Sequence, residues 1–436
     1  MTADPTGGST NRDVMAASLH SSAASLWCPS CRSEIALPST SEHAIARCEC
    51  RSYPYVEGVV VGDVAVREPL LASIRAGDVE ASRKLLLGKH RSKHDLLFRS
   101  RRPATFRQFL RHNQLVRLTE GLGLRKPFMW LRPRRLFRQI VDSAQFNLYM
   151  RHRFCAPSLL ATMALLGLVR LRPGVVLDAP CGMGHLSWML SRLVPAQRLL
   201  CLDLVPSFAY SARRFFVPDA AASIAHDLNH QMPLPDGSIS TIFSSDSIHY
   251  VDNKALLVSE FKRVLNDTGV VVVSHMHNKL QRNPAAGAPL TPQDYYRLFD
   301  GFHVQLQPEA DLLRSYLDNQ AVDLSTPVPL EILERSQALV AVASKSPLPA
   351  SVPAVRLDLI NAAAGLSVNG LYRLNEHGGA RYFERVVPDG LADEYPELID
   401  SLPARVDAGS YGRIDDEDDR VRLLEAGVLL DVPPGY

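Results

Sequence analysis

The stretch Val175-Val-Leu-Asp-Ala-Pro-Cys-Gly-Met-Gly184 decides the fold of this chain. Its three apolar residues lead into a carboxylate, Asp178, and a tight loop with Gly182 and Gly184 follows. The pattern from His185 onward is helical, so the segment predicts a buried parallel strand, a turn and the first helix of a βαβ unit. Glycine suits such a turn because a side chain would keep the backbone away from a bound ligand.

The same pattern, an apolar run that ends in a carboxylate, returns three times downstream. These runs and their carboxylates are residues 198–202 with Asp203, residues 222–225 with Asp227, and residues 239–245 with Asp246. An acidic residue at the tip of the second strand can bind both hydroxyls of a ribose, and Asp203 comes 19 residues after Gly184. The series predicts an α/β fold with a parallel sheet that binds a nucleoside at one edge.

Asp178-Ala-Pro-Cys-Gly-Met-Gly184 resembles the first motif of the class I S-adenosylmethionine-dependent methyltransferases, in the branch of the ubiquinone and menaquinone methyltransferases. Pro180 departs from that motif, because it stands in place of a glycine and removes one N–H donor. The loop 234–239 and the segment 261–273 resemble later parts of the same family, so the resemblance covers roughly residues 145–345. It implies a Rossmann-like, seven-stranded methyltransferase sheet.

The resemblance also assigns residues to the cofactor S-adenosyl-L-methionine. They are Asp178, Gly182 and Gly184 at its methionine end, Asp203 at the ribose, Asp227 at the adenine, and Ser245 and Asp246 closing the pocket. Another nucleotide-binding doubly wound domain, such as a dehydrogenase, is the alternative. Its Gly-x-Gly-x-x-Gly fingerprint would place glycine at position 187, where this chain has Ser187.

Three histidines fall at the ends of predicted strands, the edge where open α/β sheets bind ligands. His249 follows the fourth strand, and His275 and His277 end the fifth. A histidine can deprotonate or orient a hydroxyl or amide acceptor, so we expect His249 and His275 to be the catalytic residues. His275 and His277 can also bind a metal, but no third ligand stands at a spacing that indicates one. A place in the pocket wall or on the surface is the remaining alternative.

Four of the seven cysteines cluster near the amino terminus, as Cys28, Cys31, Cys48 and Cys50. Two cysteine pairs on opposing turns can bind Zn²⁺ tetrahedrally. So small a module has too little hydrophobic core to fold without a metal or a similar cross-link. The segment resembles the Trm112-like zinc ribbons found beside some methyltransferases, although its second pair is Cys-x-Cys. That departure leaves two alternatives open, that His43 replaces one cysteine or that the ribbon binds no metal.

The length of 436 residues predicts more than one domain, since single cores stop growing near about 250–300 residues. We expect a flexible tail (1–20), a zinc-ribbon-like module (21–66), a basic helical segment (67–145), the methyltransferase domain (146–346) and a carboxy-terminal α+β domain (347–436), with which a winged-helix-like arrangement is compatible. The sequence shows no signal peptide and no apolar run of about 18 residues, and its cysteine usage is typical of a reducing compartment. These features predict a cytoplasmic protein.

The charge of the chain is uneven, although its net value is only +2. From Arg83 to Arg138 there are 17 lysines or arginines and two acidic residues, whereas residues 415–419 are all acidic. A basic segment of this kind can bind RNA or another anionic partner, or it can face solvent and pack against the acidic end of the same chain.

The function expected from these features is methyl transfer from S-adenosyl-L-methionine to a small-molecule acceptor, either a secondary metabolite or a carrier-bound intermediate. One alternative is an RNA methyltransferase of the ribosomal-RNA guanine type, or a protein methyltransferase, that uses the ribbon and the basic segment for recognition. The other is a non-catalytic binding subunit with the same fold. The intact glycine loop and Asp203 argue against that last alternative.

Overall fold

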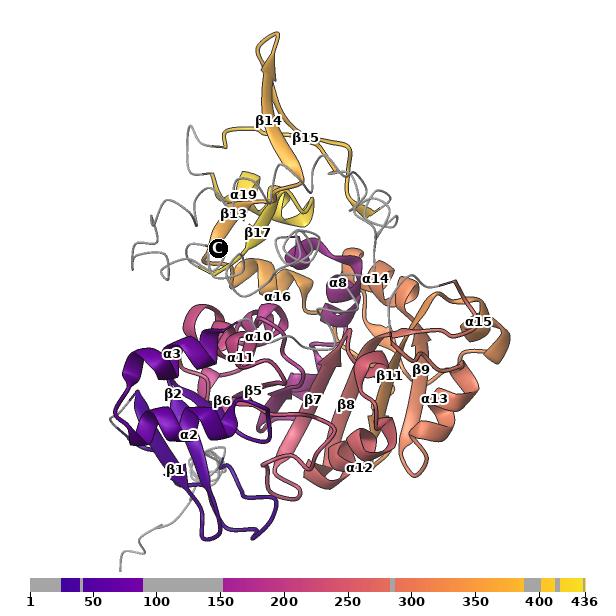
Figure 1. The fold of residues 1–436 in the computed structure, drawn as a ribbon. Coiled ribbons are helices and arrows are strands. Elements are labelled where there is room, and N and C mark those ends of the chain that lie inside the picture. Colours follow the sequence, from indigo (N-terminus) through magenta and orange to yellow (C-terminus); the bar gives the residue numbers. More distant parts are fainter. Residues whose placement is uncertain are drawn as a thin grey trace, which may run out of the picture.

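The computed structural model describes residues 25–39, 42–88, 152–282, 287–387, 401–411, 416–433 and 436. A ten-stranded sheet runs through its centre, in the order β1-β2-β3-β6-β5-β4-β7-β8-β11-β9 (Figure 1). Its strands are β1 (His43–Arg47), β2 (Ser52–Val56), β3 (Val59–Val61), β4 (Val176–Asp178), β5 (Leu199–Asp203), β6 (Ala222–Ala225), β7 (Ile239–Ser245), β8 (Leu265–His277), β9 (His303–Pro308) and β11 (Ala338–Ser344).

The seven strands from β6 to β9 form the predicted Rossmann-like sheet. Strands β6, β5, β4, β7 and β8 pair in parallel, and β11 is antiparallel to both β8 and β9. Asp178 at the end of β4 is level with Cys201 on β5 and Phe243 on β7. This register brings the carboxyl ends of neighbouring strands to one edge of the sheet, which confirms the fold class expected from the apolar runs.

Helices cover both faces of the sheet (Figure 1), and several of them begin where the sequence supplies a cap or a proline. Asn253 caps α12 through its side chain, Thr291 caps α13, and α8 and α11 each begin with a proline. The helices up to the carboxy-terminal unit are α2 (Arg67–Arg75), α3 (Val79–Leu87), α8 (Pro157–Met163), α9 (Leu168–Leu171), α10 (His185–Leu190), α11 (Pro206–Ser211), α12 (Lys254–Val264), α13 (Pro292–Leu298), α14 (Glu309–Leu317) and α15 (Leu330–Arg335).

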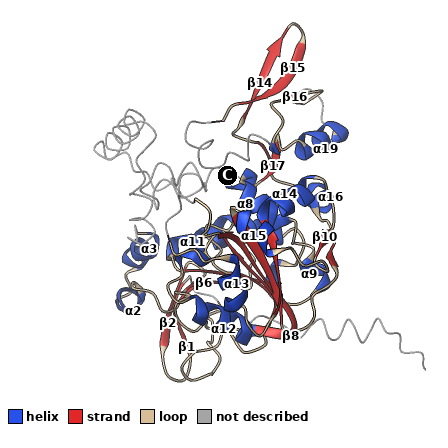
Figure 2. Cartoon of the chain, turned by 90° about the vertical axis from the view of Figure 1, so that its right-hand side faces the viewer, coloured by secondary structure: helices blue, strands red, loops and turns tan. Residues whose placement is uncertain are grey.

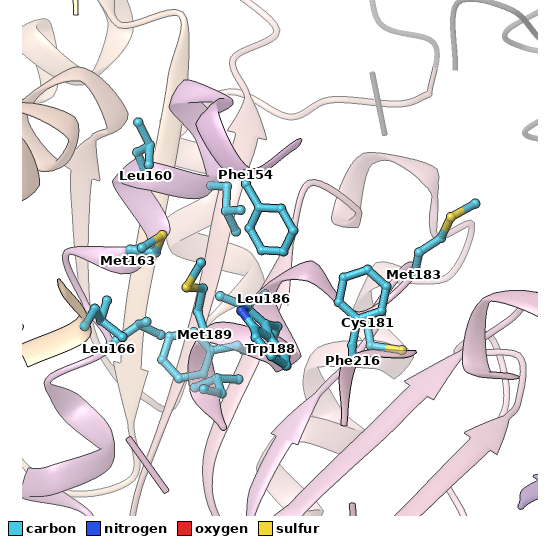
Figure 3. Packing of buried hydrophobic residues seen from close by; sticks show 14 of the residues in the cluster. Phe154, Leu160, Met163, Leu166, Cys181, Met183, Leu186, Trp188, Met189 and Phe216 are labelled. Carbon is cyan, nitrogen blue, oxygen red and sulfur yellow. The ribbon is translucent and has the colours of Figure 1, made fainter. Parts of the chain in front are cut away.

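Two apolar cores lie on the two faces of this sheet. Successive residues of a strand point to opposite faces, so Val176 belongs to one core and Leu177 to the other. Both side chains are at most 1% exposed. Figure 3 shows part of the first core, with Leu160 and Met163 of α8 and Leu186, Trp188 and Met189 of α10.

The amino-terminal module is part of the main sheet. Strand β3 pairs in parallel with β6, Val60 being level with Ile224, so β1, β2 and β3 extend the seven strands to ten. The sequence predicts a separate small module, because the apolar run Val59–Val61 does not reveal its distant partner strand. Figure 1 shows this module at one edge of the sheet, with α2 and α3 over it.

The described residues of the carboxy-terminal unit form two small antiparallel sheets and two helices. The elements are α16 (Arg356–Asn361), β13 (Leu366–Val368) paired with β17 (Leu429–Asp431), the sheet β14 (Tyr372–His377), β15 (Ala380–Arg385) and β16 (Arg405–Asp407), and α19 (Glu417–Glu425). A separate pair, β10 (Val322–Asp323) and β12 (Ser351–Val352), precedes the unit. Figures 1 and 2 show the unit beyond α8, with the hairpin β14–β15 projecting outward.

Several predictions fall outside the described residues. They concern the tail 1–20 and most of the basic segment, whose described part ends at residue 88 with α2 and α3. Within the described part of the chain, no helix has the length and apolar character required to span a bilayer.

Candidate functional site

The glycine loop after β4 uses its two glycines for different reasons. Gly182 has a φ of 53°, and a Cβ built on it would meet no described atom within 4 Å. Gly184 has a φ of 104°, and its Cβ would lie 2.8 Å from the Cα of Ala212. Gly182 therefore faces open space, whereas Gly184 permits close packing of α10 against the segment after α11.

Asp203, at the tip of β5, binds this loop directly. Its Oδ2 accepts a hydrogen bond from the backbone N–H of Gly182 at 2.9 Å, and its Oδ1 accepts one from the N–H of Val205 at 2.8 Å. The residue is 5% exposed. Burial raises the pKa of Asp203 to about 7, despite these two hydrogen bonds to the carboxylate.

Asp178, at the tip of β4, is buried beside it. The hydroxyl of Ser187 on α10 donates to Asp178 Oδ2. Asp178 Oδ1 is buried and has no hydrogen-bond partner among the described residues. Burial raises the pKa of Asp178 to about 7 as well. Because buried polar atoms are normally paired, this Oδ1 is a candidate acceptor for a ligand.

Asp227, just after β6, is held by its own turn and by the amino-terminal module. Its side chain accepts hydrogen bonds from the backbone and side-chain N–H groups of Asn229, both at 2.9 Å. Its backbone N–H points to the carbonyl of Asp63 at 3.3 Å. Residue 63 follows β3, so the added strands reach the edge of the sheet at which Asp227 lies.

A second group of polar side chains stands at the ends of β7 and β8. The group consists of Ser245, Asp246, His249, His275 and His277, with Arg153 and Glu309 beside them. Asp246 and His275 are non-glycine residues with φ values of 55° and 53°. Such strained backbone at the ends of two adjacent strands is typical of functional sites.

His275 lies between two carboxylates. Its Nδ1 is 2.8 Å from Glu309 Oε2, and its Nε2 is 3.8 Å from Asp246 Oδ1. Although burial favours the neutral imidazole, these two carboxylates raise the pKa of His275 to about 9. Burial alone would raise the pKa of Asp246, but His275 and Arg153 hold it well below its usual range.

Arg153 joins this group from a distant part of the sequence. It lies in a short 3₁₀ turn, Arg153–Cys155, before α8, and its guanidinium is 3.8 Å from Asp246 Oδ2. The same guanidinium donates to the hydroxyls of Ser158 at 2.5 Å and Ser245 at 3.4 Å. These bonds fix the charge of Arg153 on one side of Asp246.

His249 and His277 complete the group. The His249 ring is 1% exposed, and its centroid lies 4.3 Å from that of His277 and 4.0 Å from that of Tyr250. The structure thus brings both predicted catalytic histidines, His249 and His275, into one cluster. His277 bridges them, because its ring centroid is also 4.6 Å from that of His275.

Arg153 and Glu309 are site residues that were not predicted from the sequence. Glu309 begins α14 directly after β9, which ends at the same edge as β8 because both are antiparallel to β11. The rule that finds carboxylates at strand tips, applied to this strand, would have identified it. Arg153 has no such signal, since only the tertiary fold brings residues 153 and 246 together.

A cluster of aromatic rings packs beside the glycine loop. The Tyr436 hydroxyl is 3.0 Å from His185 Nε2, and the ring of Tyr436 makes edge contacts with Phe154 and Phe216. Figure 3 shows Phe154 and Phe216 in this region. The carboxy-terminal unit also contacts α10, where Trp188 Nε1 donates to the carbonyl of Asp431 at 3.2 Å. It therefore supports the first helix of the predicted cofactor site.

The four clustered cysteines form a compact thiol group in the amino-terminal module. Their sulfur atoms all lie within 4.8 Å of one another, with Cys28–Cys50 at 3.5 Å and Cys48–Cys50 at 3.8 Å. Four thiolates at about 2.3 Å from one zinc ion lie about 3.8 Å apart, so the donor set fits Zn²⁺. His43 is 3.1 Å from Glu57 and is not a member of the group.

Comparisons with known proteins were consistent with this geometry. A family model described as a methyltransferase domain matches residues 177–273. The chain is 35% identical over 102 residues to the malonyl-[acyl-carrier protein] O-methyltransferase of Yersinia pestis, covering 23% of this chain. It is 29% identical over 117 residues to the 2-methyl-6-phytyl-1,4-hydroquinone methyltransferase of Synechocystis, covering 27% of this chain. The chain spans 36% of the length of each of these two relatives.

A similar solved structure is a complex between the Haloferax volcanii Trm112 methyltransferase activator and a methyltransferase, with 17% identity and a TM-score of 0.33. That similarity covers 47% of this chain and 95% of the other. The family match falls on the strands and the glycine loop that carry Asp178, Asp203 and Asp227. Residues 177–273 of this chain thus match a methyltransferase domain.

Proposed function

We propose that this protein transfers the methyl group of S-adenosylmethionine to a small-molecule or carrier-bound acceptor at the carboxyl edge of its sheet. The observation that carries the proposal is the pair of buried carboxylates around an open glycine loop. Asp203 accepts a hydrogen bond from the backbone N–H of Gly182, and Asp178 has one buried oxygen without a hydrogen-bond partner among the described residues.

The residues present fit the cofactor. Asp178 Oδ1 would accept from the ammonium of its methionine end, and Asp203 would accept from its ribose hydroxyls. The turn of Asp227 would lie at its adenine, and Ser245 and Asp246 would close the pocket. When bound, S-adenosylmethionine supplies an electrophilic methyl group on a positively charged sulfur. Two buried carboxylates favour that charge.

The role of this chain in the reaction is to align the methyl donor with the acceptor. Holding donor and acceptor in line can supply about 7–11 kcal/mol of the barrier in well-oriented systems. His249 and His275 stand next to Asp246 in the cluster at the ends of β7 and β8, and we assign to them the binding and orientation of the acceptor. Arg153 and Glu309 act as positioning residues, because they hold Asp246 and His275 in place.

The acceptor class rests on the named relatives. One acts on malonyl-[acyl-carrier protein] and the other on a methyl-phytyl-hydroquinone, according to their names. Both acceptors carry oxygen groups on an otherwise large molecule. The domain boundaries, the zinc in the ribbon and RNA recognition by the basic segment remain predictions.

The test is methyl transfer from radiolabelled S-adenosylmethionine to a panel of malonyl thioesters and substituted hydroquinones, followed by mass spectrometry. Wild-type protein should label an acceptor, and the His275→Ala variant should retain cofactor binding while losing at least about tenfold in turnover. Unchanged turnover in both His275→Ala and His249→Ala would refute the assignment of the acceptor site.

A further inference from the structure

We infer that Asp246, His275 and His277 form a binding site for a divalent first-row transition metal ion, separate from the cysteine cluster. The ligand atoms of the three side chains all lie within 4.8 Å of one another. No third ligand for the pair His275 and His277 is evident from the spacing of residues in the sequence. The structure supplies it, because β7 and β8 are adjacent parallel strands and Asp246 directly follows β7.

The distances are close to those of a shared ion. Two atoms that are each about 2.1 Å from one metal lie at most about 4.2 Å apart. His275 Nε2 and Asp246 Oδ1 already satisfy this limit at 3.8 Å. The third donor, on His277, needs a shift of no more than a fraction of an ångström. Two imidazoles and one carboxylate are the donor set of octahedral sites with open positions for a ligand.

The orientation of His275 supports the same conclusion. Its Nδ1 is 2.8 Å from Glu309 Oε2, which leaves Nε2 directed toward Asp246. Metal-binding histidines commonly donate their other ring N–H to a carboxylate, and this second contact fixes the ring and its tautomer. Glu309 would therefore be the supporting carboxylate, because it touches His275 and is not one of the three ligands.

Arg153 stands beside the site and approaches the other carboxylate oxygen of Asp246. Its guanidinium approaches Asp246 Oδ2 at 3.8 Å, whereas His275 faces Oδ1 of the same carboxylate. The two oxygens of Asp246 thus serve different partners. Hydrogen bonds to Ser158 and Ser245 hold the guanidinium on its side. A cation between Asp246 Oδ1 and the two histidines would leave these contacts intact.

The role of this ion rests on the proposed function and would narrow the acceptor to one that offers an oxygen. A hydroxyl held at an open position of the ion loses its proton to solvent more readily, as metal-bound water does. Its oxygen then forms a bond to the methyl carbon, and the bond from methyl to sulfur breaks with its electron pair left on sulfur. A catechol, hydroquinone or enol acceptor has this chemistry.

Cobalt(II) distinguishes the two metal sites, because thiolate ligands give intense charge-transfer bands that nitrogen and oxygen ligands do not. We would strip the full-length protein of metal, add Co²⁺ and count bound ions by equilibrium dialysis. Wild type should bind one more ion per chain than the His277→Ala and His277→Gln variants, without any difference in the charge-transfer bands. Replacement of the exposed His303 by alanine should leave the count unchanged.

Glu309→Gln should lower the affinity for this second ion about 10- to 100-fold, although it removes none of the three ligands. Circular dichroism and calorimetric titration with S-adenosylhomocysteine, run on each variant, separate the inference from the proposed function. If the wild type and both His277 variants bind the same number of ions while all of them bind the cofactor product, the metal site is refuted and the methyltransferase proposal stands. If the extra ion binds and the cofactor product does not, only the proposed function fails.

Discussion

The backbone N–H of Asp63 donates a hydrogen bond to Nδ1 of His226 at 3.2 Å, and this contact joins the amino-terminal module to the tip of β6. Around it, Gly62 N–H donates to the carbonyl of Ala225 at 2.7 Å. A Cβ on Gly62 would lie 2.6 Å from His226 Nδ1, so the two segments are in close contact. The added strands therefore support the loop that begins with Asp227.

His226 should make this junction sensitive to acid. Burial lowers the pKa of His226 to about 4, below the value of about 6.5 expected in the unfolded chain. The stability that depends on the neutral ring is therefore fully present above about pH 6.5 and is lost as the pH falls toward 4. The loss at the acid end is at most about 3 kcal/mol.

Urea unfolding across this pH range measures the effect. The His226→Asn variant keeps an acceptor near the position of Nδ1 but does not titrate, so its free energy of unfolding should fall less steeply on acidification than that of the wild type. Parallel pH profiles for the two proteins would show that His226 does not carry the dependence.

The two loop glycines should respond differently to a methyl group. Gly182→Ala places its Cβ in open space, so it should cost about 1–3 kcal/mol of backbone strain and, in addition, weaken cofactor binding. Gly184→Ala drives its Cβ against the backbone of residue 212 and should destabilise the fold by more than Gly182→Ala does. Thermal melts and calorimetric titration of both variants test this, and equal destabilisation with no change in affinity would contradict it.

The cysteine cluster should hold one zinc ion. Cys48→Ser removes one ligand, so elemental analysis should show that the variant loses the ribbon zinc and melts at a lower temperature. Cys155→Ser is the matched control, because Cys155 is buried outside the cluster and its thiol donates to the carbonyl of His152. Zinc retained in Cys48→Ser to the same extent as in Cys155→Ser would contradict the assignment.

The affinity for S-adenosylmethionine should fall as the solution is acidified. The pKa of Asp203 is raised by burial to about 7, so its carboxylate gains a proton just below neutral pH. A protonated Asp203 loses its attraction for the positive cofactor, and the affinity should drop by up to about tenfold per pH unit below 7. Calorimetric titration from about pH 8 to about pH 6 measures the slope. An affinity that stays constant or rises on acidification would contradict the role of this carboxylate.

Much of the central sheet could be predicted from the sequence, because its strands are short apolar runs that end in polar residues. The runs before Asp178, Asp203 and Asp246 became β4, β5 and β7. The three carboxylates lie at one edge of the sheet because parallel pairing aligns the ends of the strands. The clustering of His249 and His275 agrees with the same rule.

The remaining features depend on long-range packing that no local pattern reports. The sequence of Val59–Val61 predicts an apolar strand, but nothing local indicates that it pairs with β6 and adds the amino-terminal module to the sheet. Arg153 reaches Asp246 only because the turn before α8 folds over the ends of β7 and β8. Asp246 and His275 could have been grouped, since they stand at the carboxyl ends of adjacent strands, yet the family resemblance assigned Asp246 to the cofactor alone.

Calorimetric titration with S-adenosylmethionine on wild type, Asp203→Asn and Asp219→Asn tests the central claim most directly. Asp219 is exposed and serves as the matched control. Wild type and Asp219→Asn should bind with equal affinity, and Asp203→Asn should bind at least about tenfold more weakly, because its amide loses one backbone hydrogen bond and the negative charge. No heat of binding with wild type, or equal affinity in Asp203→Asn, would contradict the account.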